Sequence, residues 1–401
     1  MSVTRVTSHW LFSRYPLPLG GAVFLLQVAL GLILFATFQD YVPRKLEVGA
    51  AWPGYLLAAY GAGRFLFEAP TGAISDRVER KVGLLIGFVL MIPAIVLMAG
   101  VNSRYVFLFC AALLGLGTSF IWPATYAIAA DLYPAARRGK VIGFLNVGQL
   151  AGFGIGALGG AQIVNHVTWE QFVLALVAIS LATAATAIGV PSYRGQGWLK
   201  SVPRETEARL KDVLSLRLVL LSGIILASST SLAIILPAIR PYGTEQLGIE
   251  FSELTVALIP AIIASLVLYV PAGHLADRLG RAFPYLLGLG LLAGGLLWLA
   301  ETTAVSVAMI GAAVVFSGNV FIVPASTAAV MDLAPETYRG TLIGLNVALT
   351  GLGLTIGPAI GGPVAEYAGP DMALRVAAFV ALGTAAALFA YSRVFRMHPI
   401  V

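Results

Sequence analysis

The sequence predicts an all-α integral membrane protein with twelve transmembrane helices in two related six-helix bundles. Three observations predict this fold: apolar segments recur along nearly the whole chain, several motifs repeat at a fixed offset, and basic residues follow the alternation of the predicted loops. Of the 401 residues, 59% are hydrophobic and 11% are charged, and the mean hydropathy is +0.89. A soluble domain could not bury that much apolar surface.

The apolar runs define the spans. About 20 apolar residues cross a hydrocarbon core about 30 Å thick, and unbroken runs favour helices over the alternating strands of a barrel. We expect spans at 17–38, 52–71, 82–100, 105–129, 140–163, 169–190, 214–239, 253–272, 283–300, 303–328, 341–365 and 372–391.

The basic residues predict the orientation of these spans. With the N-terminus inside, 19 of the 25 Lys and Arg residues fall in inner segments, and the outer side holds only Arg44, Lys45, Arg104, Arg240 and Arg375. The positive-inside rule therefore places both termini in the cytoplasm, in a multi-pass protein of the cell (inner or plasma) membrane. We expect no cleavable signal peptide at the N-terminus.

The second half of the chain repeats the first at an offset of 201 residues. Pro123 aligns with Pro324 and Asp131 with Asp332, and the segment 72–80 aligns with 273–281. The repeat predicts an N-terminal six-helix bundle at 1–190, a cytoplasmic linker at 191–213 and a C-terminal six-helix bundle at 214–401. The linker is either an amphipathic helix on the membrane surface or a solvated connection.

Two loops carry a more specific signal. The pattern Gly-x-x-x-Asp-Arg-x-x-Arg at 72–80, and Gly-x-x-x-Asp-Arg-x-Gly-Arg at 273–281, resembles the signature loops of the major facilitator superfamily. The resemblance covers essentially the whole chain, and among the members it is similar to are the twelve-helix proton-coupled drug efflux antiporters. It implies the superfamily's fold of two parallel six-helix repeats and the function of a transporter, not an enzyme.

The resemblance also implies a cytoplasmic gate. Arg80 would meet Asp131 and Arg281 would meet Asp332, while carboxylates of the loops cap neighbouring helix ends when the cytoplasmic side is closed. The alternative is that these charges only anchor the topology. The residues assigned to this gate are Asp76, Arg77, Arg80, Asp131, Arg138, Asp277, Arg278, Arg281, Asp332 and Arg339.

Glycines in the fifth and eleventh spans resemble the glycine motif of antiporters in this superfamily. The positions are Gly152 and Gly156 in the fifth span and Gly357 and Pro358 in the eleventh, and Ala157 stands where proline is usual. Small residues let helix backbones approach and proline can bend a helix, which favours helices that rock; ordinary tight packing is the alternative. Ala111 replaces an arginine that many proton-coupled exporters carry, so we do not expect coupling by that route.

Charges inside the spans are candidates for the site of transport, because they are costly in hydrocarbon. Arg64 and Glu68 are four residues apart and share one face of the second span. We predict that Glu68 carries a proton and that Arg64 attracts an anionic group or sets the charge state of Glu68; a static ion pair is the alternative. Asp40, with Arg44 close by, is predicted to be an outer-gate or interfacial charge.

Polar and aromatic residues in the middle of the spans are candidates for substrate contacts, since apolar walls with a few polar groups suit an amphiphilic ligand. About half of them should instead form hydrogen bonds between helices. They are Gln27, Trp122, Tyr126, Asn146, Gln149, Asn319 and Asn346.

The sequence lacks the residue patterns of metal, cofactor and ATP sites. Cys110 is the single cysteine and the histidines are scattered, so we expect no metal site and no cofactor, and no Walker A sequence is present for ATP. The basic residues follow topology, which excludes a nucleic-acid partner. We expect a monomer among membrane lipids that exports a small amphiphilic molecule, with protons as coupling ion. The alternatives are a lipid or glycolipid flippase of the same fold and a membrane sensor without transport.

Overall fold

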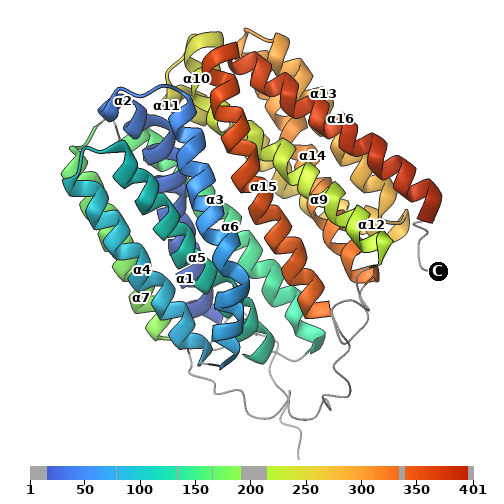
Figure 1. The fold of residues 1–401 in the computed structure, drawn as a ribbon, viewed down its shortest axis with the longest axis horizontal. Coiled ribbons are helices and arrows are strands. Elements are labelled where there is room, and N and C mark those ends of the chain that lie inside the picture. The colour runs from blue at the N-terminus through green and yellow to red at the C-terminus, as the bar shows by residue number, and fades with distance from the viewer. Residues whose placement is uncertain are drawn as a thin grey trace, which may run out of the picture. The chain divides into compact units, whose positions relative to one another are not determined.

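The computed structural model describes residues 16–77, 79–132, 135–164, 166–190, 215–333 and 339–395. The predicted linker at 191–213 therefore lies wholly outside the described residues. All regular elements of the described part are helices (Figure 1).

Most spans are single helices, and three are built from several pieces: the first, the seventh and the eighth. The first span comprises α1 (Pro16–Gly31), the π-helix η2 (Leu32–Tyr41) and α2 (Val42–Leu46), and the next five are α3 (Ala51–Arg77), α4 (Arg80–Gly100), α5 (Arg104–Leu132), α6 (Ala135–Ile163) and α7 (Trp169–Ile188). The second half contains α9 (Leu216–Ile234), η3 (Leu236–Ala238), α10 (Ile239–Pro241), η4 (Tyr242–Gln246), α11 (Phe251–Ala257), α12 (Ile259–Arg278), α13 (Ala282–Glu301), α14 (Val305–Leu333), α15 (Arg339–Ala368) and α16 (Pro370–Phe395).

The fold class is confirmed. Within the described ranges, 11 helical segments are long and apolar enough to cross a membrane. The remaining long helix is α3, which carries Arg64 and Glu68 and completes the twelve. We call the end of the helices that carries Asp40 and Arg240 the outer end, following the prediction from the basic residues.

The chain forms two compact units. The first contains Met1–Thr37 and Leu66–Glu205, and the second contains Phe38–Phe65 and Thr206–Val401. Residues 38–65 run from the end of the first predicted span through the following loop into the second predicted span, yet they pack with the second half of the sequence. Helix α3 thus begins in the second unit and ends in the first. The division into two bundles at 191–213 stays a prediction.

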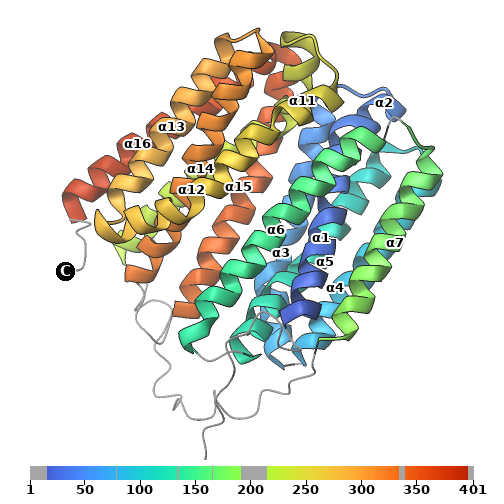
Figure 2. The same cartoon turned by 180° about the vertical axis from the view of Figure 1, so that it is seen from behind.

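The repeat of the sequence is visible in the packing of each unit (Figures 1 and 2). In the first unit α1 packs against α6, and α4 packs against α5 and α7. In the second unit α9 packs against α15, and α13 packs against α14 and α16. These are the same three pairs when the helices are matched by the offset of 201 residues.

Glycines allow the closest of these contacts. A Cβ atom on Gly156 of α6 would overlap the carbonyl oxygen of Val28 in α1, and a Cβ on Gly152 would overlap that of Phe24. In α15, a Cβ on Gly357 would lie 2.5 Å from the Cβ of Ala233 in α9. The backbones could not approach in this way if any of the three positions carried a larger residue. The predicted hinge at Gly357 and Pro358 remains a prediction.

Three spans differ from the continuous α-helices that the sequence predicts. The first passes through a π-helix of 10 residues before it reaches Leu46. The seventh ends its α-helix α9 at Ile234 and continues through η3, α10 and η4. The eighth is interrupted at Leu258, between α11 and α12. Pro260 explains the interruption, because proline has no N–H to donate to the carbonyl of Val256.

Candidate functional site

A buried ion pair joins the first and seventh spans at the outer end of the second unit. Asp40 in η2 is only 4% exposed. Its Oδ1 accepts a hydrogen bond from Nε of Arg240 at 3.0 Å, and its Oδ2 accepts one from Nη2 of Arg44 at 2.5 Å. Both carboxylate oxygens are therefore engaged by charged donors, which are the stronger kind of hydrogen bond.

Both residues of this ion pair lie where the chain departs from α-helical geometry. Asp40 lies in the π-helix η2, where the hydroxyl of Thr37 donates to the carbonyl of Leu32 at 3.1 Å. Arg240 lies between η3 and η4, in a short turn flanked by Pro237 and Pro241. A π-helix shifts the side chains beyond it relative to a continuous α-helix, and such turns are frequent at functional sites.

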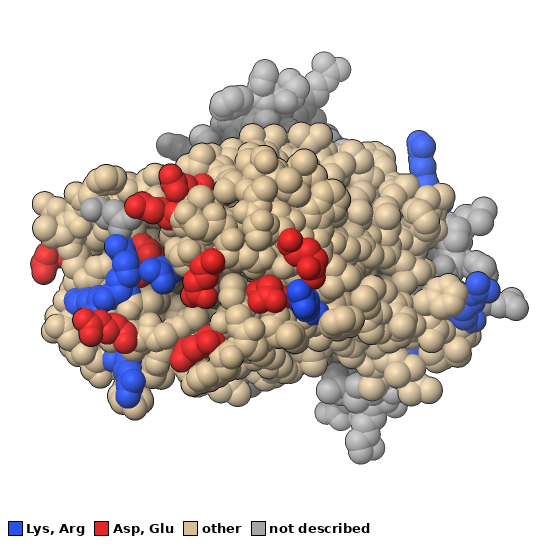
Figure 3. All heavy atoms as spheres, turned by 90° about the horizontal axis from the view of Figure 1, so that it is seen from above, with Lys and Arg blue, Asp and Glu red and all other residues tan. Residues whose placement is uncertain are grey.

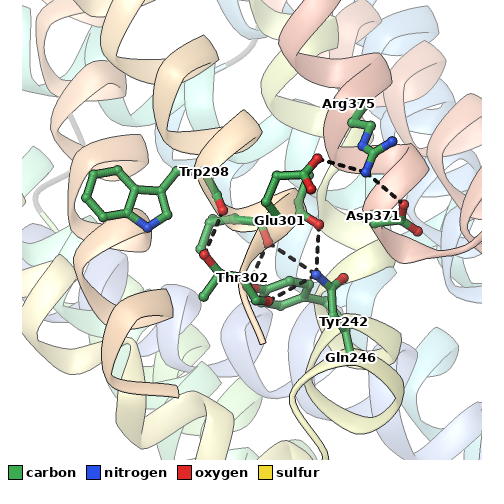
Figure 4. Close-up of polar contacts among 9 residues, drawn as sticks. Tyr242, Gln246, Trp298, Glu301, Thr302, Asp371 and Arg375 are labelled. Atoms are coloured by element: carbon green, nitrogen blue, oxygen red, sulfur yellow. Dashed lines mark hydrogen bonds and ion pairs between the residues drawn. The ribbon is translucent and has the colours of Figure 1, made fainter. Parts of the chain in front are cut away.

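The segment that carries Arg240 is fixed to the end of α13 (Figure 4). The amide of Gln246 donates to three carbonyl oxygens, those of Leu299, Ala300 and Thr302, at 3.3, 3.0 and 3.1 Å. The hydroxyl of Tyr242 donates to Leu299 as well, at 3.1 Å. These donors bond to carbonyls at and just after the C-terminal end of α13, where a helix lacks its usual N–H donors. The guanidinium of Arg240 is therefore presented from a firmly anchored turn.

A second ion pair stands beside this anchor. Nη2 of Arg375 in α16 donates to Oε1 of Glu301 at 2.8 Å and lies 3.6 Å from Oδ2 of Asp371 (Figure 4). It offsets the unfavourable position of an acid at the C-terminus of α13. Figure 3 shows acidic and basic side chains together on one end of the molecule. Asp40 is the buried acid of these two outer ion-pair groups, whereas Glu301 is exposed and Asp371 is half-buried.

Glu68 occupies a buried position in α3, with 8% of its surface exposed. One turn further along, the hydroxyl of Thr71 donates to the carbonyl of Ser119 in α5 at 2.8 Å and lies 3.2 Å from the carbonyl of Glu68 itself. This hydrogen bond fixes the inner part of α3 on α5. Arg64 is half-buried on the same helix, four residues before Glu68.

Three of the predicted substrate residues lie together in the first unit. The rings of Trp122 and Tyr126 in α5 are 6.1 Å apart, and the hydroxyl of Tyr126 donates to Oδ1 of Asn146 in α6 at 3.5 Å. Gln149 is half-buried one turn along α6. Gln27 of α1 lies opposite Gly152, whose added Cβ would be 3.0 Å from the Cβ of Gln27. Helices α1, α5 and α6 therefore contribute all five residues.

The remaining two predicted substrate residues, Asn319 and Asn346, lie in the second unit. Nδ2 of Asn346 in α15 donates to Oγ1 of Thr327 in α14 at 3.2 Å, so this amide is used in helix packing. Thr327 is the counterpart of Tyr126 at the offset of 201 residues, and Asn346 lies one position before the counterpart of Asn146, so the two contacts are similar. Asn319 is half-buried in α14.

One contact of the predicted cytoplasmic gate is described. Nε of Arg281 donates to Oδ2 of Asp332 at 3.0 Å, and Arg278 is exposed nearby at the end of α12. Arg80 is half-buried at the start of α4. The side chains of the other predicted gate residues lie outside the described part of the structure: Asp76, Arg77, Asp131, Arg138, Asp277 and Arg339. The gating role stays a prediction.

A cavity of about 70 Å³ lies within the second unit, among side chains of the segment 235–247 and of α11, α13, α14 and α16. Its lining is apolar except for Tyr242, whose hydroxyl is bonded to Leu299. Apolar cavities of this kind stay dry. None of the predicted substrate residues lines it, and it offers no polar group that could orient a substrate.

Sequence reasoning missed two residues at the outer end, Arg240 and Glu366. Arg240 entered only as one of the outer basic residues, although it lies one position from the counterpart of Asp40 at the offset of 201. Glu366 ends the eleventh span, four residues after Gly362, and its Oε2 accepts a hydrogen bond from the backbone N–H of Ala51 at 2.7 Å. No local pattern marks that contact, because it joins residues 315 positions apart.

Comparison with known proteins identifies the kind of molecule. The sequence model described as Major Facilitator Superfamily matches residues 19–228 and 218–399. Multidrug resistance protein 2 of Bacillus subtilis (strain 168) is 24% identical over 344 residues, which cover 83% of this chain and 84% of that protein. The proton-coupled antiporter flippase LtaA of Staphylococcus saprophyticus is 24% identical over 357 residues, or 86% of each chain.

Solved structures show the same fold. The structure of a bacterial homolog to the human lysosomal transporter Spinster, in an inward-facing and unoccupied conformation, superposes with a TM-score of 0.77. It covers 95% of this chain and 97% of that one at 15% sequence identity. At that identity the likeness concerns the fold alone.

Proposed function

Because this chain belongs to the Major Facilitator Superfamily, we propose that it is a proton-coupled exporter of a small amphiphilic molecule. A secondary transporter of this superfamily is a multi-pass membrane protein and not an enzyme, and its substrate is a small molecule. The proposal adds the direction of transport, the coupling ion and the chemistry of the substrate. In alternating access, the two repeats rock about a site near the membrane midplane.

The proposal of proton coupling rests on the buried carboxyl of Glu68. A charged carboxylate in a membrane helix is costly, so intramembrane acids commonly serve in proton or substrate pathways. Protonation removes that cost, and a group that alternates between the two forms can couple proton entry to a change of state. Arg64, on the same face of α3, would set the charge state of Glu68 or attract an anionic group of the substrate. A static pair is the competing interpretation.

The pair of aromatic rings and the amides of the first unit support an amphiphilic substrate. Trp122 and Tyr126 provide apolar surface, while Asn146 and Gln149 provide donors and acceptors from α6. Ligand sites typically combine such apolar walls with a few placed polar groups. The names of relatives, a multidrug resistance protein among them, agree with a substrate of this chemistry.

The gates complete the proposal. We assign the outer gate to Asp40 and Arg240, which join the first and seventh spans, and the cytoplasmic gate to the predicted charge clusters that include Arg281 and Asp332. In this assignment both termini face the cytoplasm. The protein acts as a monomer, as each chain contains both repeats.

The decisive experiment changes Glu68 to Gln in protein reconstituted into vesicles. A pH gradient should drive ethidium across the membrane with the unchanged protein and not with Glu68→Gln, whereas exchange of ethidium at equal pH should persist. Glu245→Gln removes an exposed acid and serves as the matched control. Unchanged gradient-driven flux in Glu68→Gln would refute the proton role.

A lipid or glycolipid flippase is the second candidate, and one observation favours it. The relative of Staphylococcus saprophyticus that matches 86% of this chain is named a proton-coupled antiporter flippase. The half-buried Arg64 would suit the anionic head of such a substrate. Leaflet exchange of a labelled anionic glycolipid, without flux of ethidium, would favour this candidate over drug export. The third alternative, a sensor, would show binding without flux.

A further inference from the structure

Glu366 caps the helix that carries the predicted proton site. Its Oε2 accepts a hydrogen bond from the backbone N–H of Ala51 at 2.7 Å, and Ala51 is the first residue of α3. The first N–H groups of a helix have no partner within the helix, and the helix dipole makes this end attractive to an anion. A carboxylate of α15 therefore provides the N-terminal cap of α3, over 315 residues of sequence.

The turn before α3 has room for this carboxylate only because residue 49 is glycine. A Cβ on Gly49 would overlap Oε2 of Glu366 and lie 2.5 Å from its Cδ. The carbonyl of Gly49 accepts from the N–H of Trp52 at 3.2 Å, which begins the helix. The backbone and the carboxylate thus fit one another closely.

Below this contact, α3 and α15 approach backbone to backbone. A Cβ on Gly54 would lie 2.9 Å from Cα of Gly362, and a Cβ on Gly61 would lie 2.8 Å from Oγ1 of Thr355. We call this contact line, from Gly54 to Gly61 on α3 and from Thr355 to Gly362 on α15, the α3–α15 seam. Glu366 is exposed and closes the seam at its outer end.

We propose that Glu366 is a positioning residue of the transport cycle, which latches α3 to α15 while the outer side is closed. The inference rests on the proposed function in one respect, that the two halves part at the outer side during transport. A helix of each half takes part in the contact. A hydrogen bond from a helix end to an exposed carboxylate can open without unfolding either helix, because water replaces both partners.

The test measures access to the seam from outside, in a Cys110→Ser background that carries Thr355→Cys. Intact vesicles are treated with a membrane-impermeant thiol reagent. We expect Glu366→Ala to raise the labelling rate about fivefold, as for the loss of one helix cap. Glu366→Gln keeps an acceptor oxygen without the charge, so the rise should be smaller. The control is Glu245→Ala, an exposed acid of the same outer end, which should label at the original rate.

Gly49→Ala provides an independent variant that leaves Glu366 in place. Its added methyl group should displace the carboxylate and raise labelling as Glu366→Ala does. If both act on one contact, the double variant should label no faster than either single variant. Equal labelling of Glu366→Ala and the parent, or additive effects in the double variant, would overturn the latch.

The same labelling separates this inference from the proposed function, because it requires no transport. If the pH gradient drives no flux but Glu366→Ala still speeds labelling, the coupling proposal fails and the latch stands. If flux follows the gradient and labelling is unchanged, the latch fails and the coupling proposal stands.

Discussion

Arg240 donates from Nε to the buried carboxylate of Asp40 at 3.0 Å, and the two residues occupy nearly equivalent places in the two repeats. Asp40 lies near the outer end of the first span, and Arg240 lies one position before the residue that the offset of 201 matches to it. Asp40 lies within the π-helix η2, and Arg240 lies two positions before the π-helix η4. The second unit thus joins the outer ends of the first and seventh spans by opposite charges, which is what an outer gate requires.

Removing Arg240 should destabilise the protein more than removing Arg44. Arg240→Ala leaves a buried carboxylate with one charged partner, and we expect a loss of about 1–3 kcal/mol in the free energy of unfolding. The side chain of Arg44 is 43% exposed and pairs with Asp40 within one turn, so Arg44→Ala should cost below about 1 kcal/mol. Thermal unfolding in detergent compares the two variants, and a larger loss in Arg44→Ala would contradict the assigned gate.

Two glycines of α6 give a matched pair of variants. A Cβ on Gly156 would overlap backbone of Val28, which cannot move aside, so Gly156→Ala should cost at least about 1–3 kcal/mol. A Cβ on Gly154 meets nothing within 4 Å, and Gly154→Ala should be neutral or stabilise by up to about 1 kcal/mol. Melting temperatures test both, and similar values for the two variants would show that α1 and α6 are not packed this closely.

Gln246 should contribute to both the stability and the flux of the protein. Gln246→Ala leaves the carbonyls of Leu299, Ala300 and Thr302 without their shared donor (Figure 4), at a cost of about 1–3 kcal/mol. Because the same turn carries Arg240, flux should fall as well. Thr244→Ala, in the same turn, removes one exposed hydroxyl and should have little effect on either measurement. A normal melting temperature in Gln246→Ala would exclude the proposed anchor.

Asn146→Ala should weaken substrate binding and leave the coupling to the pH gradient unchanged. Asn146→Ala removes an amide beside Trp122 and Tyr126, and we expect KM for ethidium to rise about tenfold, the factor for one hydrogen bond worth roughly 1.4 kcal/mol. The dependence of flux on the pH gradient should persist. Asn102→Ala changes an exposed loop and serves as the control. An unchanged KM would assign Asn146 to helix packing, the use that Asn346 makes of its amide in the contact with Thr327.

The sequence predicted the fold because hydrophobic length and an internal repeat are both local or periodic signals. The spans recur with little shift, and the three equivalent helix pairs of each unit follow from the repeat. Hydropathy could not reveal the π-helix that orients Asp40, since it changes hydrogen bonding and not composition. Pro260 is a sequence signal for the break at Leu258, but the prediction of a single span at 253–272 did not use it.

The site was harder to predict, because its contacts join distant residues. Asp40 and Arg44 were associated by their spacing, but Arg240 reaches them from 200 residues away. The role of Glu366 can be inferred only from its hydrogen bond to the first residue of α3, which lies far away in the sequence. Asn346 illustrates another difficulty, because a hydrogen bond between helices, such as the one it donates to Thr327, cannot be told from a substrate contact by sequence.

The most direct test of the account is the flux of ethidium into vesicles that contain the purified protein under an imposed pH gradient. The account predicts uptake or release that follows the direction of the gradient, stops when an ionophore collapses it, and is lost in Glu68→Gln. Flux that ignores the gradient, or that Glu68→Gln leaves intact, would contradict it.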